Sequence, residues 1–324
     1  MPIRVDLDQH KGATRHNEVS DAISLRDCVA LDASFQDLAT REAGAEGVDP
    51  RALAVRTLLH LPRVTRRDRR IPIAGIVGEL RATARQLAED TKAAGHLVSF
   101  GPLEAAAPRS RVYDLKLFQF TQIDDGQAAD IFSHLHYLRS ARPGSRNFAL
   151  LDPHDERPVS LCSVSPLEWR RVGHAIAGQF GVPMEQAWDV SRVYAVNHAP
   201  RNSISYLLSQ VRSWLRHHET GVKLLTTAVD TNLSFTGSSY RADNWRHWVT
   251  VQPRPYLYHN RRYVSPRQLR TQYGTSNITE LAERYPRDRF EQSRVPLLDT
   301  MIFCIRVSAE TESIPPESRR RLHR

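Results

Sequence analysis

The stretch that decides the fold spans residues 190 to 230 and reads VSRVYAVNHAPRNSISYLLSQVRSWLRHHETGVKLLTTAVD. Its first apolar run, Val190–Val196, predicts a strand, and Asn202 or Ser203 can cap a following helix. The run Lys223–Val229 predicts a second, buried strand that ends at Asp230. The helix between them carries apolar residues at the 3.6-residue period: Ile204, Leu207, Leu208, Val211 and Leu215. Strand, helix and strand in this order indicate an α/β sheet with helices on its faces.

The residues before this stretch extend the same pattern. The alternating, aromatic-rich run Arg111–Thr121 predicts a strand, and Asp124 begins a helix that runs toward Tyr137. Two short apolar runs, Asn147–Leu151 and Pro158–Val164, flank a turn and predict a hairpin. We therefore expect a mixed sheet flanked by helices as the main fold.

The N-terminal part has a different texture. From Val19 to about Ala94 the chain is rich in Ala, Arg and Leu with helical spacing, and the Gly- and Pro-bearing segment Phe100–Ser110 predicts a hinge. We expect three parts: a helical accessory domain over 1–107, which can also bind nucleic acid; an α/β domain over 108–310; and a basic tail over 311–324. A tail of this kind is more often disordered than functional.

Composition restricts the class of protein. The 324 residues carry 45 Lys and Arg against 36 Asp and Glu, a net charge of +9, which favours an anionic partner such as nucleic acid, nucleotide or anionic lipid. The three cysteines, Cys28, Cys162 and Cys304, match no zinc or CxxC spacing and indicate a reduced, intracellular chain. No apolar signal segment and no run of about 18 apolar residues is visible, so we expect a cytoplasmic protein without membrane spans.

Two basic segments are candidates for phosphate contact. Five of the eight residues in Arg63–Arg70 are Arg, and a solvated linker is the alternative interpretation. The segment Tyr256–Arg270 interleaves Tyr with Arg, which suits phosphate and base contacts, although an ordinary amphipathic hairpin has the same pattern. The residues assigned to nucleic acid from these segments are Arg66, Arg67, Arg69, Arg70, Arg261 and Arg262.

The strand, loop and helix start at Ser191–Ser205 form a candidate anion site, because a helix N-terminus offers free N–H groups. Arg201, Asn202 and Ser203 are the candidate cofactor contacts there. The order of elements resembles acyltransferases of the GNAT superfamily, in which this junction carries the phosphates of acyl-CoA. Their loop is rich in glycine, whereas residues 201 to 205 contain none, which argues against acyl-CoA as the donor.

A second candidate segment runs from Leu224 to Trp245. An Asp at the carboxyl end of a strand faces the crevice where α/β folds bind ligands, so Asp230 can act as base, metal ligand or hydrogen-bond acceptor, or simply cap a loop. Tyr240, Asn244 and Trp245 follow a Gly-led turn and offer a phenol, an amide and a stacking surface for a flipped base. A core role for Trp245 is the alternative.

These motifs together resemble the Mom family of phage DNA modifiers. The resemblance covers roughly residues 111 to 250 and includes Asn202-Ser-x-Ser205 and Phe-Thr-Gly-x-x-Tyr240. It implies a GNAT-like fold and the modification of adenine in DNA at its exocyclic amine, with a carbamoylmethyl group added. It also implies that one set of residues lines the active site: His136, Tyr137, Arg192, Ser205, Asp230 and Tyr240.

The residue types suggest roles for this set. Asp230 and His136 suit proton transfer, and Arg192 suits a negative charge on the donor or a phosphate. His136 with Tyr137, Tyr240 and Asp230 can also bind iron or another transition metal, since imidazole, phenolate and carboxylate are competent ligands. The structural alternatives are an interior His136, an ion-paired Arg192 and a Ser205 that belongs only to the first helical turn.

Two other functions stay open at this stage. The stretches His136-Tyr-Leu138 and Phe235-Thr-Gly-Ser-Ser-Tyr-Arg-Ala-Asp-Asn-Trp245 resemble the Druantia DruA-type defence family, which implies DNA binding or processing without group transfer. An acyltransferase acting on a small molecule or aminoacyl-tRNA is the other alternative, in which the basic surface serves CoA or tRNA phosphates. We expect DNA as the partner, with tRNA as the alternative, and adenine as the modified base.

Overall fold

A single large sheet organises the protein. The computed structural model describes residues 21–99, 114–308 and 321–322, so the expected hinge at Phe100–Ser110 lies outside the described residues. Eight strands follow the spatial order β13, β8, β12, β7, β6, β5, β4, β3. Their bounds are β13 (Arg321–Leu322), β8 (Arg246–Val251), β12 (Thr300–Arg306), β7 (Leu224–Val229), β6 (Ala187–Ala195), β5 (Pro158–Pro166), β4 (Arg146–Leu151) and β3 (Gln119–Ile123). In the part of the expected tail that is described, Arg321 and Leu322 form β13 at the edge of the sheet and pair with β8.

The sheet is mixed, as predicted. Within the described residues, β6 with β7 and β8 with β13 are parallel, and the other neighbours are antiparallel. Helix α8 (Ser203–His218) follows β6 and leads back to β7, which is the strand, helix and strand order read from residues 190 to 230. None of the helices in the described ranges is both long and apolar enough to cross a bilayer.

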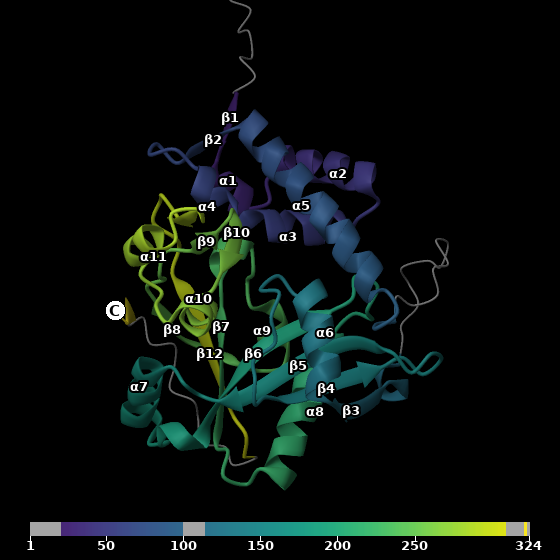
Figure 1. Ribbon diagram of the computed structural model, residues 1–324. Coiled ribbons are helices and arrows are strands. Elements are labelled where there is room, and N and C mark those ends of the chain that lie inside the picture. The colour runs from purple at the N-terminus through teal and green to yellow at the C-terminus, as the bar shows by residue number, and fades with distance from the viewer. Residues whose placement is uncertain (1–20, 100–113, 309–320, 323–324) are drawn as a thin grey trace, which may run out of the picture.

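Helices cover both faces of the sheet. Phe148 on β4 packs edge-on against Trp214 of α8, whereas the preceding residue, Asn147, donates a hydrogen bond to Asp125 at the start of α6 (Asp125–Leu135). Because successive residues of a strand point to opposite faces, α8 and α6 lie on opposite sides of the sheet (Figure 1). Helix α7 (Arg170–Phe180) packs through a separate apolar cluster near the β8 and β12 side.

The parallel strands β6 and β7 part soon after they begin. They pair only from Ala187 to Asp189 against Leu224 to Thr226, although each strand continues beyond that point. A bulge in the pairing of β5 with β6 leaves one extra residue, Ser191, in β6. Such a residue changes the alternation of side chains, so Asp189 and Arg192 face the same side of the sheet. The gap between β6 and β7 is where the candidate site is built.

The N-terminal helices form a bundle next to the sheet (Figure 1). Asp32 and Asp49 cap the second and third helices with their side chains, which explains why those helices begin there. The elements are β1 (Ala22–Ser24), α1 (Leu25–Val29), α2 (Ala33–Glu46), α3 (Pro50–Leu58), α4 (Leu61–Val64), β2 (Arg70–Pro72) and α5 (Ile73–Ala94). Their apolar core also includes Leu233, Tyr256 and Tyr258, so the bundle shares one core with segments of the α/β part.

A small module lies between β8 and β12 in the sequence. It contains β9 (Leu257–His259), β10 (Arg262–Val264), α10 (Pro266–Tyr273), α11 (Ile278–Arg284) and β11 (Phe290–Gln292). The three strands form their own sheet, in the order β10, β9, β11, over a core of Leu257, Leu269, Leu281 and Phe290. Figure 1 shows this module beside the N-terminal helices. The sequence indicated a hairpin here and did not predict the two helices.

Candidate active site

Asp230 lies at the end of β7 and uses both carboxylate oxygens. Oδ1 accepts from the backbone N and the side-chain amide of Asn232, at 3.0 and 2.8 Å, and caps the short 3₁₀ helix η3 (Thr231–Leu233). Oδ2 accepts a hydrogen bond from the hydroxyl of Tyr256. Asp230 therefore caps η3 with Oδ1, as the sequence allowed, and binds the phenol of Tyr256 with Oδ2. This pairing gives Asp230 a fixed orientation at the open end of the strand.

Three further aromatic or charged groups lie around Asp230. The rings of Tyr256 and Tyr263 meet edge-on, with centroids 5.4 Å apart. Burial raises the pKa of Tyr263 to about 12, with the charge of Asp230 contributing. Burial also raises the pKa of Tyr137, and Asp230 adds to the rise while Arg192 opposes it. The charges of Asp230 and Arg192 therefore act on both Tyr137 and Tyr263.

We call this group the site cluster. It draws side chains from the loop after α6, from β6, from the end of β7, from α9 (Ser238–Ala242) and from the inserted module. Apart from the buried Tyr256, the members are half-buried, which leaves each of them partly open to solvent. The members are Tyr137, Arg192, Asp230, Tyr240, Tyr256 and Tyr263. Tyr137, Arg192, Asp230 and Tyr240, which the sequence singled out, are thus brought together, and their chemical roles stay predictions.

Tyr240 lies where β6 and β7 separate. Its hydroxyl is 3.3 Å from Oγ1 of Thr227 on β7, and the same Oγ1 donates to the carbonyl of Val190 on β6 at 3.0 Å. Its ring packs on Trp245 and Phe303. Burial raises the pKa of Tyr240, so the phenol is neutral near pH 7. The chain's own Thr227 and Tyr240 therefore bridge the gap between the two strands.

Arg192 holds the loop that carries Tyr137. Its Nε donates to the carbonyl of Ser140 at 2.8 Å, Nη2 to the Ser140 hydroxyl at 3.2 Å, and Nη1 to the carbonyl of Ser191 at 2.6 Å. None of these contacts is with a carboxylate. Within the described residues Arg192 is therefore not the ion-pair partner that the sequence left open. A cation held by carbonyls keeps its charge for an anionic partner.

His136 is an interior residue, which the sequence analysis gave as the alternative to a catalytic role. Its residue is 3% exposed, and Nδ1 accepts from the backbone N of Leu138 at 3.2 Å. Burial lowers the pKa of His136 well below its ordinary value, and the charges of Arg192 and Arg56 lower it further. The ring lies 4.3 Å from that of Tyr137, centroid to centroid. We infer that neutral His136 shapes the turn under Tyr137, and proton transfer through it stays a prediction.

The iron ligands suggested by the sequence have a restricted donor set. Nδ1 of His136 is taken by a backbone N–H, and the raised pKa values of Tyr137 and Tyr240 disfavour the phenolate form that binds metal. In the parts of the chain that are described, no group of three His, Cys, Asp or Glu is arranged to hold a metal ion. The chemistry of these side chains therefore does not fit iron well.

The start of α8 differs from the predicted cap. Asn202 is in a left-handed conformation with φ of 70°, and its side chain makes no capping hydrogen bond. Ser203 and Ser205 are buried, and the Ser205 hydroxyl donates back to the carbonyl of Asn202 at 3.0 Å. Ser205 thus behaves as a first-turn residue. Arg201 and Asn202 are exposed and stay candidates for cofactor contact, whereas buried Ser203 is poorly placed for it.

A match to a protein-family model identifies the family of this chain. The family model of the Mom protein family matches residues 117–302, more than half of the chain. The chain belongs to the Mom protein family. The Mom match includes every member of the site cluster and leaves the N-terminal helices outside it. A search of curated proteins found no match.

Several acetyltransferases of known structure are similar to this Mom family chain at low sequence identity. An N-acetyltransferase from Staphylococcus aureus Mu50 is 9% identical with a TM-score of 0.30, over 51% of this chain and 68% of that one. An acetyltransferase of the GNAT family from Desulfovibrio desulfuricans is 11% identical with a TM-score of 0.33, over 59% and 99%. The ribosomal-protein-S18-alanine N-acetyltransferase from Escherichia coli is 10% identical with a TM-score of 0.32, over 61% and 98%.

The base-stacking role expected of Trp245 is wrong. Trp245 is 2% exposed, and its indole N–H donates to Asp243 Oδ2 at 2.9 Å. Asp243 in turn pairs with Arg212 of α8, with the closest atoms 2.8 Å apart. A buried indole with its N–H satisfied is a core residue and has no free face for a base. The neighbouring Asn244 is exposed and remains a candidate for nucleic-acid contact.

The basic candidates lie on exposed turns. Arg66, Arg67, Arg69 and Arg70 are exposed, whereas Arg63 of the same run is buried, with Nη2 2.5 Å from Glu79 Oε1. Arg69 and Arg261 are left-handed, with φ of 63° and 70°. Arg261 occupies the second position of the two-residue turn between β9 and β10, where glycine is preferred. Backbone geometry therefore gives no reason for an arginine at 261.

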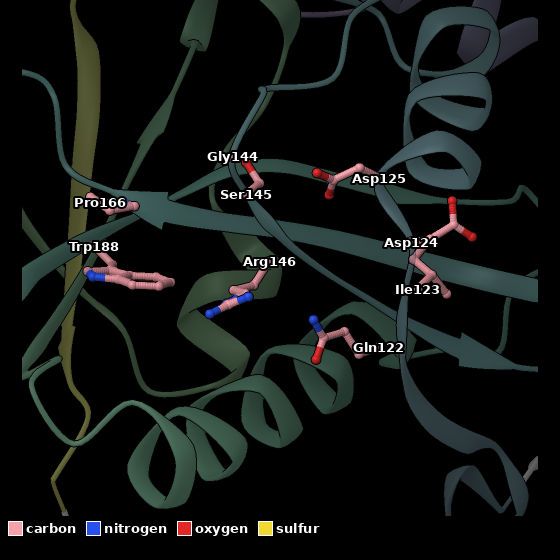
Figure 2. A pocket seen from close by; sticks show the side chains of 9 residues that line it. All are labelled: Gln122, Ile123, Asp124, Asp125, Gly144, Ser145, Arg146, Pro166 and Trp188. Carbon is pink, nitrogen blue, oxygen red and sulfur yellow. The ribbon is translucent and has the colours of Figure 1, made fainter.

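One recess lies away from the site cluster. It has a volume of about 400 Å³ and is lined by Gln122, Ile123, Asp124, Asp125, Gly144, Ser145, Arg146, Pro166 and Trp188. Figure 2 shows Trp188 and Pro166 on one side, Asp124 and Asp125 on the other and Arg146 between them. Trp188 belongs to the start of β6, whereas Asp230 follows the end of the parallel strand β7, so the recess is at the other end of this pair.

The sequence missed two members of the site cluster. Tyr256 and Tyr263 belong to a segment noted only for its mixture of Tyr and Arg, and nothing in that pattern pointed to Asp230. Tyr256 reaches Asp230 because the inserted module folds back on the end of β7. Such a contact across 26 residues is a product of tertiary packing.

Proposed function

We propose that this protein transfers a group to the exocyclic amine of a nucleic-acid base, with adenine in DNA as the substrate. Membership of the Mom protein family supports DNA modification as the activity. The observation that carries the proposal is a set of contacts between separate elements: Tyr256 donates to Asp230, Tyr240 meets Thr227 of β7, and Arg192 of β6 holds the loop that carries Tyr137. Such convergence of polar groups at strand ends is typical of a site and unusual in a core.

The chemistry of the amine fits the site cluster. The exocyclic amine of adenine is weakly nucleophilic, so an enzyme must place it, accept its proton and stabilise the leaving group. A new bond forms between the amine nitrogen and an electrophilic carbon of the donor, whose leaving group departs with the bonding pair. Asp230 accepts the amine proton, and Tyr256 on Oδ2 holds the carboxylate in place. Arg192, which has no carboxylate partner among its hydrogen bonds, balances negative charge on the leaving group.

Tyrosine rings supply surfaces for an unstacked base. Tyr137 and Tyr263 are half-buried, and Tyr263 packs against Tyr256, the donor to Asp230. In the proposal a flipped base stacks on one of these rings while its amine faces the carboxylate. Neutral phenols suit this role, because they neither repel nor fix an uncharged base. Tyr240, in the gap between β6 and β7, hydrogen-bonds to the donor or leaving group in the proposal.

Exposed arginines supply the contact with the DNA backbone. Tyr258 of β9 donates to the carbonyl of Leu59 at 2.8 Å, and Arg294 N donates to the carbonyl of Pro62 at 3.1 Å. These contacts place the inserted module against α4, from which the arginine-rich turn at 66–70 follows. We propose that Arg261 at the β9–β10 turn and the arginines of this second turn contact phosphates of one duplex.

Mass spectrometry of nucleosides tests the proposal. DNA from bacteria that express the protein is hydrolysed and compared with DNA from cells that express Asp230→Asn or Tyr240→Phe. The wild type should yield a new adenine adduct, and both variants should lose it while binding duplex DNA with nearly the same affinity. Unmodified DNA together with tight, salt-sensitive binding would support a binding or defence role instead, and protection by CoA in a thermal melt would support an acyltransferase.

A further inference from the structure

A buried carboxylate joins the N-terminal helices to the loop that carries Tyr137. Asp90 lies near the end of α5 and is 3% exposed. Its Oδ2 is 2.6 Å from Nη1 of Arg56 on α3, and the same oxygen accepts from Nη1 of Arg139. Its Oδ1 faces Nδ1 of His134, at 3.8 Å, in the last turn of α6. One carboxylate thus contacts groups on both sides of the boundary between the helical bundle and the α/β part.

Arg56 makes a second contact across the same boundary. Its Nη2 donates to the carbonyl of His134, which is one of the last carbonyls of α6. The final carbonyls of a helix lack partners within the helix, so a guanidinium from another element stabilises this end. Helix α5 also packs against α6 (Figure 1). The bundle therefore contacts and stabilises the C-terminal end of α6.

The loop after α6 is held from two directions. Arg139 is fixed by Asp90 on the bundle side, and the next residue, Ser140, is fixed by Arg192 on the sheet side. Arg139 has φ of 50°, an unfavourable conformation for a long side chain, which persists only where the surroundings require it. Tyr137 lies between these anchors and His136, with its ring 5.4 Å from that of Phe235.

We propose that Asp90 is a positioning residue of the active site, and that the N-terminal bundle helps to hold this site in place. Asp90 holds Arg139 and the end of α6, and these in turn place Tyr137 within reach of Asp230. The family match begins only at residue 117, so neither Asp90 nor Arg56 belongs to it. This inference rests on the proposed function for its catalytic consequence, and on contacts alone for its structural part.

Two variants test the inference. Asp90→Asn removes the charge that Arg56 and Arg139 share, and should lower the adduct yield per folded protein by at least about tenfold, with duplex affinity nearly unchanged. Because Asp90→Asn leaves Arg56 buried without a counter-charge and can unfold the chain, Arg139→Gln is the second variant; it keeps the Arg56–Asp90 pair and should act in the same direction. Glu46→Gln is the control, since it breaks the more exposed pair with Arg85 in the same bundle and should leave the yield unchanged.

A double variant separates positioning from general destabilisation. If Asp90 acts through the ring of Tyr137, on which the base stacks, Arg139→Gln should have little further effect on the yield in a Tyr137→Ala background. Equal fold-losses in both backgrounds would overturn the inference.

Amide hydrogen exchange tests the structural part even if no adduct is found. Arg139→Gln should speed exchange of Leu138 and Arg139 amides, which hydrogen-bond to His136, and leave α8 unchanged. Unchanged exchange in this loop would refute the positioning role, whereas faster exchange with no adduct from the wild type would refute only the proposed function.

Discussion

Replacement of Arg261 by glycine should weaken DNA binding without weakening the fold. Arg261 is exposed and left-handed, with φ of 70°, at the two-residue turn between β9 and β10. An L residue in this region costs about 1–2 kcal/mol, and glycine loses about 0.5–1 kcal/mol more conformational entropy on folding. The net change in the free energy of unfolding for Arg261→Gly is therefore between about zero and 1.5 kcal/mol in favour of the variant.

The change in DNA affinity follows from counterion release. One lost phosphate contact lowers the slope of log K against log salt by about 0.9, which corresponds to roughly eightfold weaker binding at about 0.1 M salt and about twofold at about 0.5 M. The assay is fluorescence anisotropy of a labelled duplex over a salt series, with thermal melts of the same samples. Arg261→Lys is the matched control, because it keeps both the charge and the backbone conformation and should keep the slope.

Two results would contradict this role of Arg261. An unchanged salt slope for Arg261→Gly would show that the β9–β10 turn does not contact phosphate. A melting temperature well below that of the wild type would show that the arginine supports the turn itself, in which case its left-handed conformation has a structural cause.

Three further predictions address the site and its surroundings. Tyr256→Phe should destabilise the protein by about 1–3 kcal/mol and also lower the adduct yield per folded molecule, because Oδ2 of Asp230 loses its donor. The control, Tyr258→Phe, loses only a hydrogen bond to a backbone carbonyl and should lower stability alone. Equal adduct yields from the two variants would contradict the role of Tyr256. Burial raises the pKa of Asp189 to about 6. The folded state therefore binds this proton more tightly than the unfolded state, and stability should fall as pH rises from about 4 to about 6. Denaturant titrations of Asp189→Asn should lack this fall in stability, and a pH profile identical to that of the wild type would refute the prediction. Millimolar CoA should leave the melting temperature unchanged, because Tyr240 bridges the gap between β6 and β7 and the loop before α8 lacks glycine; a rise of several degrees would disprove this.

Local patterns in the sequence predict the main helix and strands around the site. The helix predicted after Asn202 spans Ser203–His218, because five apolar residues at helical spacing bury one face against the sheet. The strand predicted to end at Asp230 ends at Val229, since the carboxylate of Asp230 caps the next turn. Periodicity and capping act over a few residues, and such signals can be read directly from a sequence.

Tertiary contacts explain what the sequence did not reveal. The sequence left Trp245 open between a stacking surface and a core role; its N–H meets Asp243 and the ring is buried, so it has the core role. Asn202, expected as a possible cap, is left-handed and its side chain forms no cap. The contact of Tyr256 with Asp230 and that of Asp90 with Arg139 join segments 26 and 49 residues apart. No periodic signal connects such pairs.

The central claim concerns a covalent change to a base, and tandem mass spectrometry of the modified nucleoside tests it most directly. DNA from cells that express the wild-type chain should contain a deoxyadenosine of increased mass, with the added group on the exocyclic nitrogen, and DNA from cells that express Asp230→Asn should not. A nucleoside profile identical to that of cells without the protein, at equal amounts of soluble chain, would contradict the account.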